Sequence, residues 1–362
     1  MGLGGCSEKR SVLYENGYRA QFASALVNPT TRFVNNIAYV LVGIFSLFAV
    51  LDGELSAGGI TAFLSYTSQF SKPFNEITAI TTQLQNAAAS ARRIFRLLDE
   101  PEQIPEPADA VTLAHPSGNV RFENVSFSYS ADRPLIRDFS FCVKSGTTVA
   151  IVGPTGAGKT TVVNLLMRFY ELDGGRIFVD GNDITKITRD SLRRSFGMVL
   201  QDTWLFDGTV AENIAYGRPD ATDDEITAAA KTAHAHSFIK RLPDGYATKI
   251  ESGGANLSAG QRQLLTIARA MLTDAPMLIL DEATSNVDIL TEIRIQKAFR
   301  EIMKGKTTFI IAHRLSTIRD ADIIIVMDNG NVVETGTHEE LMSHDGIYKE
   351  LVRKSLENPS EM

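Results

Sequence analysis

The chain has 362 residues, with a formal net charge of −7 at pH 7 and no long run of Lys or Arg. This length suits about two domains, and the acidic balance argues against a nucleic-acid-binding protein. The two cysteines, Cys6 and Cys142, have neither the spacing of metal ligands nor a disulfide framework, which is typical of a reducing cytosol. Cys142 lies in an apolar run, so we expect it in the core.

The N-terminal part of the chain carries its most apolar segment. Residues 8–31 predict an amphipathic helix, and residues 33–51 form an uncharged apolar stretch about long enough to span a bilayer. A buried helix of a soluble protein is the alternative for this stretch.

A second helical segment follows after a short acidic link. Residues 60–84 contain only Lys72 and Glu76 as charges but many Ser, Thr and Gln residues. As the return arm of a hairpin, this segment would line a polar cavity with one face. We therefore place two membrane helices at about 31–51 and 60–82.

Basic residues flank this hairpin on both sides, whereas the link between its arms holds only Asp52 and Glu54 as charges. The flanking residues are Lys9, Arg10, Arg19 and Arg32 before the hairpin and Arg92, Arg93 and Arg96 after it. Because positive flanks stay in the cytoplasm, we expect both ends of the hairpin there.

The composition changes again after the hairpin. Residues 97–118 are rich in Pro and acidic residues and predict a linker. From residue 119 onward, predicted strands alternate with predicted helices, and one helix is expected at 225–242. This alternation predicts a soluble α/β domain. The chain thus divides into a membrane domain at 1–96, the linker, and the α/β domain at 119–357.

The α/β domain contains a phosphate-binding pattern, G-x-x-x-x-G-K-[ST], between a predicted buried strand and a predicted helix. Its glycines let successive N–H groups turn toward phosphate oxygens, and the helix N-terminus adds its positive dipole end. Lys159 would reach the β- and γ-phosphates, and the Thr160 hydroxyl would bind Mg²⁺. The residues of this predicted phosphate loop are Gly153, Pro154, Thr155, Gly156, Ala157, Gly158, Lys159, Thr160 and Thr161.

Two acidic residues end another predicted buried strand, at residues 277–281. Asp281 could bind Mg²⁺ there, and Glu282 could polarise a water for attack on the γ-phosphate. Taken alone, the pattern also fits a strand that ends in two acids at the surface.

The third informative stretch is 256–263. Ser258 predicts a helix N-cap, and Gly260 would let the backbone approach a ligand closely. A second helix N-terminus able to hold an anion indicates another phosphate contact.

Together these residues resemble the C-terminal part of an ATP-binding-cassette (ABC) exporter, from about Tyr14 to the end of the chain. Residues 153–161 match the Walker A motif of that family, 277–281 its Walker B motif and 257–261 its signature motif, with Ala259 where the family prefers Gly. The resemblance implies an α/β P-loop NTPase with a RecA-like core, an antiparallel β subdomain and a helical signature subdomain. A two-helix transmembrane hairpin would precede this ABC ATPase domain.

The resemblance also assigns roles to single residues. Tyr129 matches the aromatic that stacks on adenine, and Gln201 matches a glutamine that contacts Mg²⁺ or the attacking water. Asp288 lies in the match to the D-loop, and His313 matches the switch histidine near the γ-phosphate. The implied cofactors are ATP and Mg²⁺. The implied catalytic residues are Glu282, His313, Gln201 and Lys159, the Mg²⁺ ligands Thr160, Gln201 and Asp281, and the further nucleotide contacts Tyr129, Ser258, Gly260, Gln261 and Asp288.

The resemblance further implies a partner chain. In this family two ATPase domains face each other head to tail, so each ATP lies between Walker A of one and the signature of the other. We expect a second ABC ATPase or half-transporter chain, in a homodimer or heterodimer, together with membrane lipid, an unknown transported substrate and no nucleic acid. The protein would sit in the cell membrane with its ATPase domain in the cytoplasm.

Such exporters have six membrane helices in each half, and this chain resembles only the fifth and sixth. The leading hypothesis is an ATP-hydrolysing component that exports a small molecule, lipid or peptide. One alternative is a truncated remnant that binds ATP and a partner chain without transport. The other is a soluble ABC ATPase, against which the uncharged segment at 33–51 argues.

Overall fold

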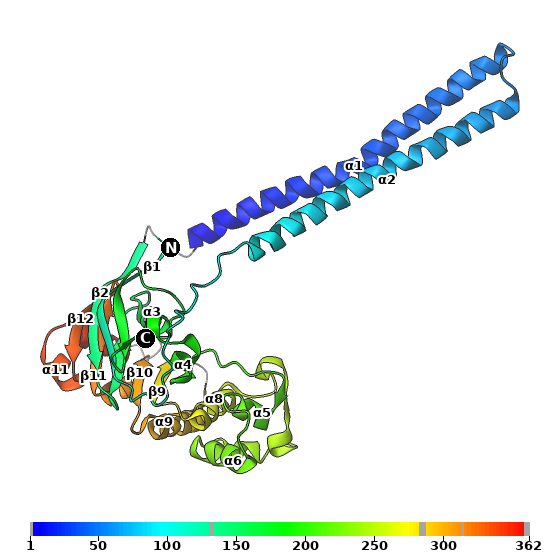
Figure 1. Ribbon diagram of the computed structural model, residues 1–362. Helices are drawn as coiled ribbons and strands as arrows, with labels where there is room; N and C mark the ends of the chain where they lie inside the picture. Colours follow the sequence, from blue (N-terminus) through cyan, green and yellow to red (C-terminus); the bar gives the residue numbers. More distant parts are fainter. Residues whose placement is uncertain (1–2, 131–132, 282–286, 313–314, 358–362) are drawn as a thin grey trace. The chain divides into compact units, whose positions relative to one another are not determined.

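The computed structural model describes residues 3–130, 133–281, 287–312 and 315–357. The chain forms two compact units, Met1–Gln103 and Ile104–Met362. The first unit consists of two long helices, α1 (Leu3–Leu51) and α2 (Ala57–Leu98), which lie side by side as an antiparallel hairpin (Figure 1).

Helix α1 joins the two predicted segments, 8–31 and 33–51, into one helix. Among the described residues, Arg32–Leu51 is the stretch long and apolar enough to cross a membrane by length and composition. Many large apolar side chains along it, including Phe45 and Phe48, are exposed in this chain. An exposed apolar surface of this kind suits contact with lipid or with further helices.

Helix α2 begins at a clear cap and extends beyond the predicted membrane segment. The Ser56 hydroxyl accepts a hydrogen bond from the Gly59 amide at 3.3 Å, which is the usual N-cap arrangement. The helix then continues to Leu98 through the Ala-rich residues 87–91, and alanine is the strongest helix former.

The second unit is built on a six-stranded sheet with the order β12-β11-β3-β10-β9-β6. Its central strands are parallel and their side chains largely buried, as expected for a sheet covered on both faces. The outer strand β12 pairs antiparallel with β11. The strands are β3 (Thr148–Val152), β6 (Phe196–Val199), β9 (Met277–Asp281), β10 (Thr307–Ile311), β11 (Ile323–Asp328) and β12 (Asn331–Gly336).

Two smaller sheets complete the strands of this unit. A four-stranded antiparallel sheet has the order β2-β1-β4-β5, and β7 pairs with β8. The strands of these sheets are β1 (Val120–Ser130), β2 (Arg133–Val143), β4 (Gly174–Val179), β5 (Asn182–Asp183), β7 (Gly208–Thr209) and β8 (Lys249–Ile250).

The helices pack around the sheets, and the six-stranded sheet divides the core in two. Helices α5, α6, α8 and α9 gather on one side of the unit (Figure 1). Strand β3 serves both cores, because Ala150 and Val152 join the core on the side of these helices while Val149 and Ile151 join the core around α3 and the antiparallel sheet. The helices are α3 (Lys159–Leu166), α4 (Arg189–Arg194), α5 (Val210–Ala215), α6 (Asp223–Thr232), α7 (His236–Ile239), α8 (Ala259–Thr273), α9 (Ile289–Met303), α10 (Leu315–Arg319), α11 (His338–Ser343) and α12 (Ile347–Glu357), with 3₁₀ turns η1 (Ile184–Lys186), η2 (Gly245–Ala247) and η3 (Ser252–Gly254).

Two local predictions are wrong. The helix expected at 225–242 divides into α6 and α7, because His234 between them adopts a left-handed backbone with φ 56°. Cys142 is exposed rather than in the core. It lies on β2, where its neighbour Val143 points inward, and successive side chains of a strand point to opposite faces.

Candidate nucleotide-binding site

The predicted phosphate loop connects β3 to α3, and two glycines determine its path. Gly153 has φ 151°, and a Cβ atom there would lie 2.1 Å from the Met327 carbonyl oxygen. Gly158 has φ 99° and is the N-cap of α3. Gly156 also has positive φ, 86°, but a Cβ there would meet nothing within 4 Å. The loop is thus packed tightly at its base and open at Gly156, as a phosphate cradle requires.

Lys159 is the first residue of α3 and folds back over this loop. Its Nζ donates hydrogen bonds to the carbonyl oxygens of Gly153 at 2.7 Å and Pro154 at 3.2 Å. Burial lowers the pKa of Lys159 below its ordinary value, and the nearby negative charge of Asp281 opposes this shift. A partly buried ammonium beside carbonyl oxygens is prepared to accept an anionic ligand.

The loop lines a cavity of about 320 Å³ to which β2 contributes Leu135, the segment after β6 contributes Gln201 and β9 contributes Asp281. The register of the sheet explains the position of Asp281, because Ile311 of β10 pairs with Ile151 of β3 on one side and with Asp281 of β9 on the other. Asp281 therefore lies level with the end of β3. The lining residues are Leu135, Thr155, Gly156, Ala157, Gly158, Lys159, Thr160, Thr161, Gln201 and Asp281.

The cavity offers the oxygen ligands that Mg²⁺ prefers. A hydroxyl (Thr160), a carboxylate (Asp281) and a side-chain amide (Gln201) line the same space. Within the described ranges, no group of three His, Cys, Asp or Glu side chains could hold a metal ion. This donor set fits an ion that is bound partly by substrate phosphates, which is how proteins commonly hold Mg²⁺.

The predicted adenine-contacting aromatic lies next to the phosphate loop. Tyr129, near the end of β1, is 53% exposed, and its hydroxyl is 3.2 Å from Thr161 Oγ1. The rings of Phe127 and Tyr170 stand nearly perpendicular to it, with centroids 4.9 and 5.1 Å away. These edge contacts and the hydrogen bond fix the orientation of an exposed aromatic ring.

Two predicted catalytic residues, Glu282 and His313, lie outside the described residues. The chain places Glu282 directly after Asp281 at the end of β9 and His313 directly after Ala312, which follows β10. Sequence reasoning missed Leu135 and Tyr170, since an apolar residue on β2 and an aromatic in the bend after α3 carry no chemical signal of their own.

The signature residues make contacts of a different kind. Ser258 is the exposed N-cap of α8, and its hydroxyl accepts from the Gln261 amide at 3.2 Å. The Gln261 side chain accepts in return from the Ser258 amide at 2.9 Å. Gly260 is buried, and a Cβ there would lie 2.4 Å from Thr291 Cγ2 of α9. The structure thus gives Gly260 a role in helix packing, where the sequence suggested only close approach to a ligand.

Asp288 is likewise engaged in its own helix. It is the N-cap of α9 and accepts a hydrogen bond from the Thr291 amide at 3.0 Å, which lowers the pKa of its carboxyl. The described lining of the phosphate cavity includes none of Ser258, Gly260, Gln261 or Asp288.

Comparison with known proteins identifies the family of both parts of the chain. Residues 136–285 match the family model "ABC transporter", and residues 6–74 match "ABC transporter transmembrane region". The chain is 52% identical, over 94% of its length, to the fatty acid ABC transporter ATP-binding/permease protein of Mycobacterium tuberculosis. The chain belongs to the ABC transporter family.

Further similarities support the ABC transporter fold. An uncharacterised ABC transporter ATP-binding protein of Bacillus subtilis, YfiC, is 45% identical over 97% of the chain. The solved structure of a bacterial Atm1-family ABC exporter with ATP bound has 36% identity and a TM-score of 0.69, and covers 97% of the chain. The predicted fold class is confirmed: an ABC ATPase domain follows a short N-terminal membrane region, which makes this ABC transporter chain a membrane-associated protein.

The chain spans only part of these ABC transporter proteins. It covers 54% of the Mycobacterium protein, 58% of the Bacillus protein and 63% of the chain in the solved structure. The transmembrane match ends at residue 74, within α2.

Proposed function

We propose that this chain is the ATP-binding and ATP-hydrolysing component of an ABC-type exporter, which couples hydrolysis to export of a small molecule, lipid or peptide. The observation that carries the proposal is the shared cavity, to which β3, β6 and β9 each lead a different functional group. Lys159 contributes a cation, Gln201 an amide and Asp281 a carboxylate. The Mycobacterium relative is named as a fatty acid transporter, so fatty acids are the first substrate class to test here.

In this proposal the residues of the cavity bind and orient ATP. Lys159 and the loop amides hold the β- and γ-phosphates, and Tyr129 stacks on the adenine. Mg²⁺ held by Thr160, Gln201 and Asp281 would supply charge neutralisation at the phosphates. Charge stabilisation by fixed groups of this kind is the largest contribution to phosphoryl transfer.

Two residues act on the attacking water and the γ-phosphate. Glu282 would orient or deprotonate the water, and His313 would contact the γ-phosphate. The signature residues of a second chain would close the opposite side of the nucleotide, and we place the ATPase domains in the cytoplasm because the basic flanks of the hairpin favour that side.

The experiment that tests this function replaces Glu282 in the full chain reconstituted in lipid nanodiscs. Glu282→Gln should keep ATP binding but lower turnover by at least ~10²-fold, because the variant cannot act as a general base. Phosphate release and binding of a fluorescent ATP analogue are measured side by side. Glu350→Gln changes an exposed side chain on α12, is the matched control and should hydrolyse ATP normally. Near-normal hydrolysis by Glu282→Gln would contradict the assignment.

A further inference from the structure

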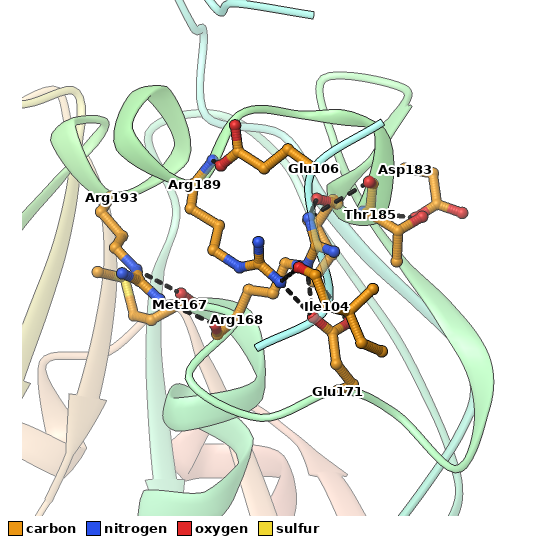
Figure 2. A network of polar contacts seen from close by, with 10 residues as sticks. Ile104, Glu106, Met167, Arg168, Glu171, Asp183, Thr185, Arg189 and Arg193 are labelled. Carbon is orange, nitrogen blue, oxygen red and sulfur yellow. Dashed lines mark hydrogen bonds and ion pairs between the residues drawn. The ribbon is translucent and has the colours of Figure 1, made fainter. Parts of the chain in front are cut away.

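A buried polar cluster lies at the opposite end of α3 from Lys159 (Figure 2). Arg168 and Arg189 are only 4% and 6% exposed. Both guanidinium groups contact one carboxylate, since Glu171 Oε1 is 3.1 Å from Arg168 Nε and 2.8 Å from Arg189 Nη2. Buried cations require such partners, so Glu171 holds the two arginines in a defined arrangement.

The same cluster holds the chain where it enters the second unit. Arg189 Nη2 donates to the Ile104 carbonyl oxygen at 2.8 Å, and the Arg189 amide donates to Glu106 Oε1 at 2.7 Å. Figure 2 shows Ile104 and Glu106 on either side of this arginine. Ile104 is the first residue of the unit, and only residues 99–103 lie between it and the end of α2. That stretch spans at most roughly 20 Å, so it is a short tether to the membrane hairpin.

Helix α4 connects this contact to the phosphate-loop helix. Arg193 of α4 donates to the carbonyl oxygens of Met167 at 3.3 Å and Arg168 at 3.0 Å, directly after α3. Arg168 itself has a left-handed backbone, φ 50°, and its Nη1 donates to two carbonyl oxygens of η1. The end of α3 is therefore fixed from two sides.

Lys159 is the first residue of the same helix. Helix α3 has eight residues and is about 12 Å long, and short helices in a close-packed interior move as rigid bodies. Arg189, Arg193 and the α3 backbone therefore form a continuous series of contacts between the segment at Ile104 and Lys159.

We propose that Glu106 and Glu171 are positioning residues of the nucleotide site, and that residues 104–106 respond to its occupancy. The proposal rests on the proposed function, because it needs a nucleotide in the phosphate loop. Binding at the loop fixes α3, which fixes α4 and strengthens the contact of α4 with residues 104–106. Because such coupling is reciprocal, loss of the Glu106 contact weakens nucleotide binding.

The test uses the full chain in lipid nanodiscs with Mg²⁺ and a non-hydrolysable ATP analogue. Amide hydrogen exchange is followed over residues 104–118, and analogue affinity is measured in the same samples. In the wild type the analogue should slow exchange of this segment by about 5-fold or more. In Glu106→Ala this difference should disappear and the Kd should rise by about the same factor. Glu106 is exposed, so the variant retains the buried Arg168–Glu171–Arg189 contacts and the fold.

Three comparisons make the outcome specific. Glu106→Gln keeps an acceptor oxygen for the Arg189 amide and should restore both readouts. Glu171→Gln should reduce both. Asp190→Asn removes an exposed ion pair on the same helix and should behave as wild type.

Nucleotide protection and affinity that stay at wild-type values in Glu106→Ala would overturn the proposal. Absence of analogue binding by the wild type would instead contradict the proposed function, and the affinity measurement reports it separately.

Discussion

The chain carries two sets of predicted nucleotide-binding residues, and they differ in what their side chains contact. Around the phosphate loop, Lys159, Gln201 and Asp281 come from separate elements and line one cavity. Around the start of α8, the Ser258 and Gln261 side chains hydrogen-bond each other's backbone, and Gly260 packs against α9. The first set converges on a space within the chain, whereas the second presents a helix N-terminus at the surface.

The start of α8 is not unusual as a piece of structure. Among the described helices, α5, α6 and α11 begin with the same reciprocal capping box, formed by Thr209, Thr222 and Thr337 with a Glu three residues later. Helix α8 has Ser258 as its N-cap and Gln261 in place of the Glu, which leaves its N-terminus without an acidic side chain. An N-terminus without a carboxylate is better suited to an external anion such as phosphate. This difference favours a composite site completed by a second chain.

The largest expected effect is on ATP hydrolysis, when a variant of the phosphate loop is mixed with a variant of the start of α8. Lys159→Ala disables the phosphate loop, and Ser258→Arg blocks the N-terminus of α8. Each alone should lower ATP hydrolysis by roughly 10²-fold, because each removes a phosphate contact from every composite site. In an equal mixture of the two chains, some dimers combine an intact loop with an intact α8, and activity should recover to roughly a quarter of wild type. The measurement is steady-state phosphate release after co-reconstitution.

The chain supplies a control for folding effects in this experiment. Thr337→Arg disrupts the same kind of cap on α11, at a cost of about 1 kcal/mol, without affecting hydrolysis. If the mixture is no more active than the single variants, the two sets of residues do not act across a dimer.

Gly260→Ala tests whether Gly260 is needed for the packing of α8 against α9, and its expected effect on stability is intermediate in size. The new Cβ meets Thr291 Cγ2 at 2.4 Å and Val287 Cγ1 at 3.0 Å, so the free energy of unfolding should fall by about 1–3 kcal/mol. Adding Thr291→Ser removes the clashing methyl group and should restore stability. Gly174→Ala, whose Cβ meets Ser126 at 3.9 Å, is the neutral control. Stability is read by thermal unfolding. If Thr291→Ser gives no rescue, the α8–α9 contact is not the cause.

The predictable parts of the molecule are those where the local pattern and the tertiary role agree. The strand at Met277–Asp281 has the predicted bounds, and an apolar strand precedes the phosphate loop as predicted. In each of them no turn-forming residue interrupts the hydrophobic pattern. The exposed Cys142 was mispredicted because β2 belongs to an antiparallel sheet, in which an apolar run need not be buried on both faces.

The rest depends on contacts between residues distant in sequence. No local signal shows that Gly260 faces Thr291, because the requirement for glycine arises only when α8 packs against α9. Likewise Arg189 reads as a surface cation on a short helix. It is buried because the chain segment at Glu106, 83 residues earlier, folds over it. Strand β12 was not predicted either, since its side chains are exposed or half-buried.

The phosphate loop also differs from the start of α8 in carrying the charged Lys159. A pH titration tests the role of this charge, and its expected effect is the smallest. Burial lowers the pKa of Lys159 below 10.5, so the folded chain loses this proton at a lower pH than the unfolded chain. ATP binding needs the charged lysine, and affinity should therefore decline as pH rises toward 10.5, by at most about 10-fold per pH unit. The free energy of unfolding of the nucleotide-free chain should rise over the same range, because the unfolded state binds more protons. Lys159→Arg stays charged throughout and should show neither change, whereas equal pH dependence in both proteins would assign the effect to another group.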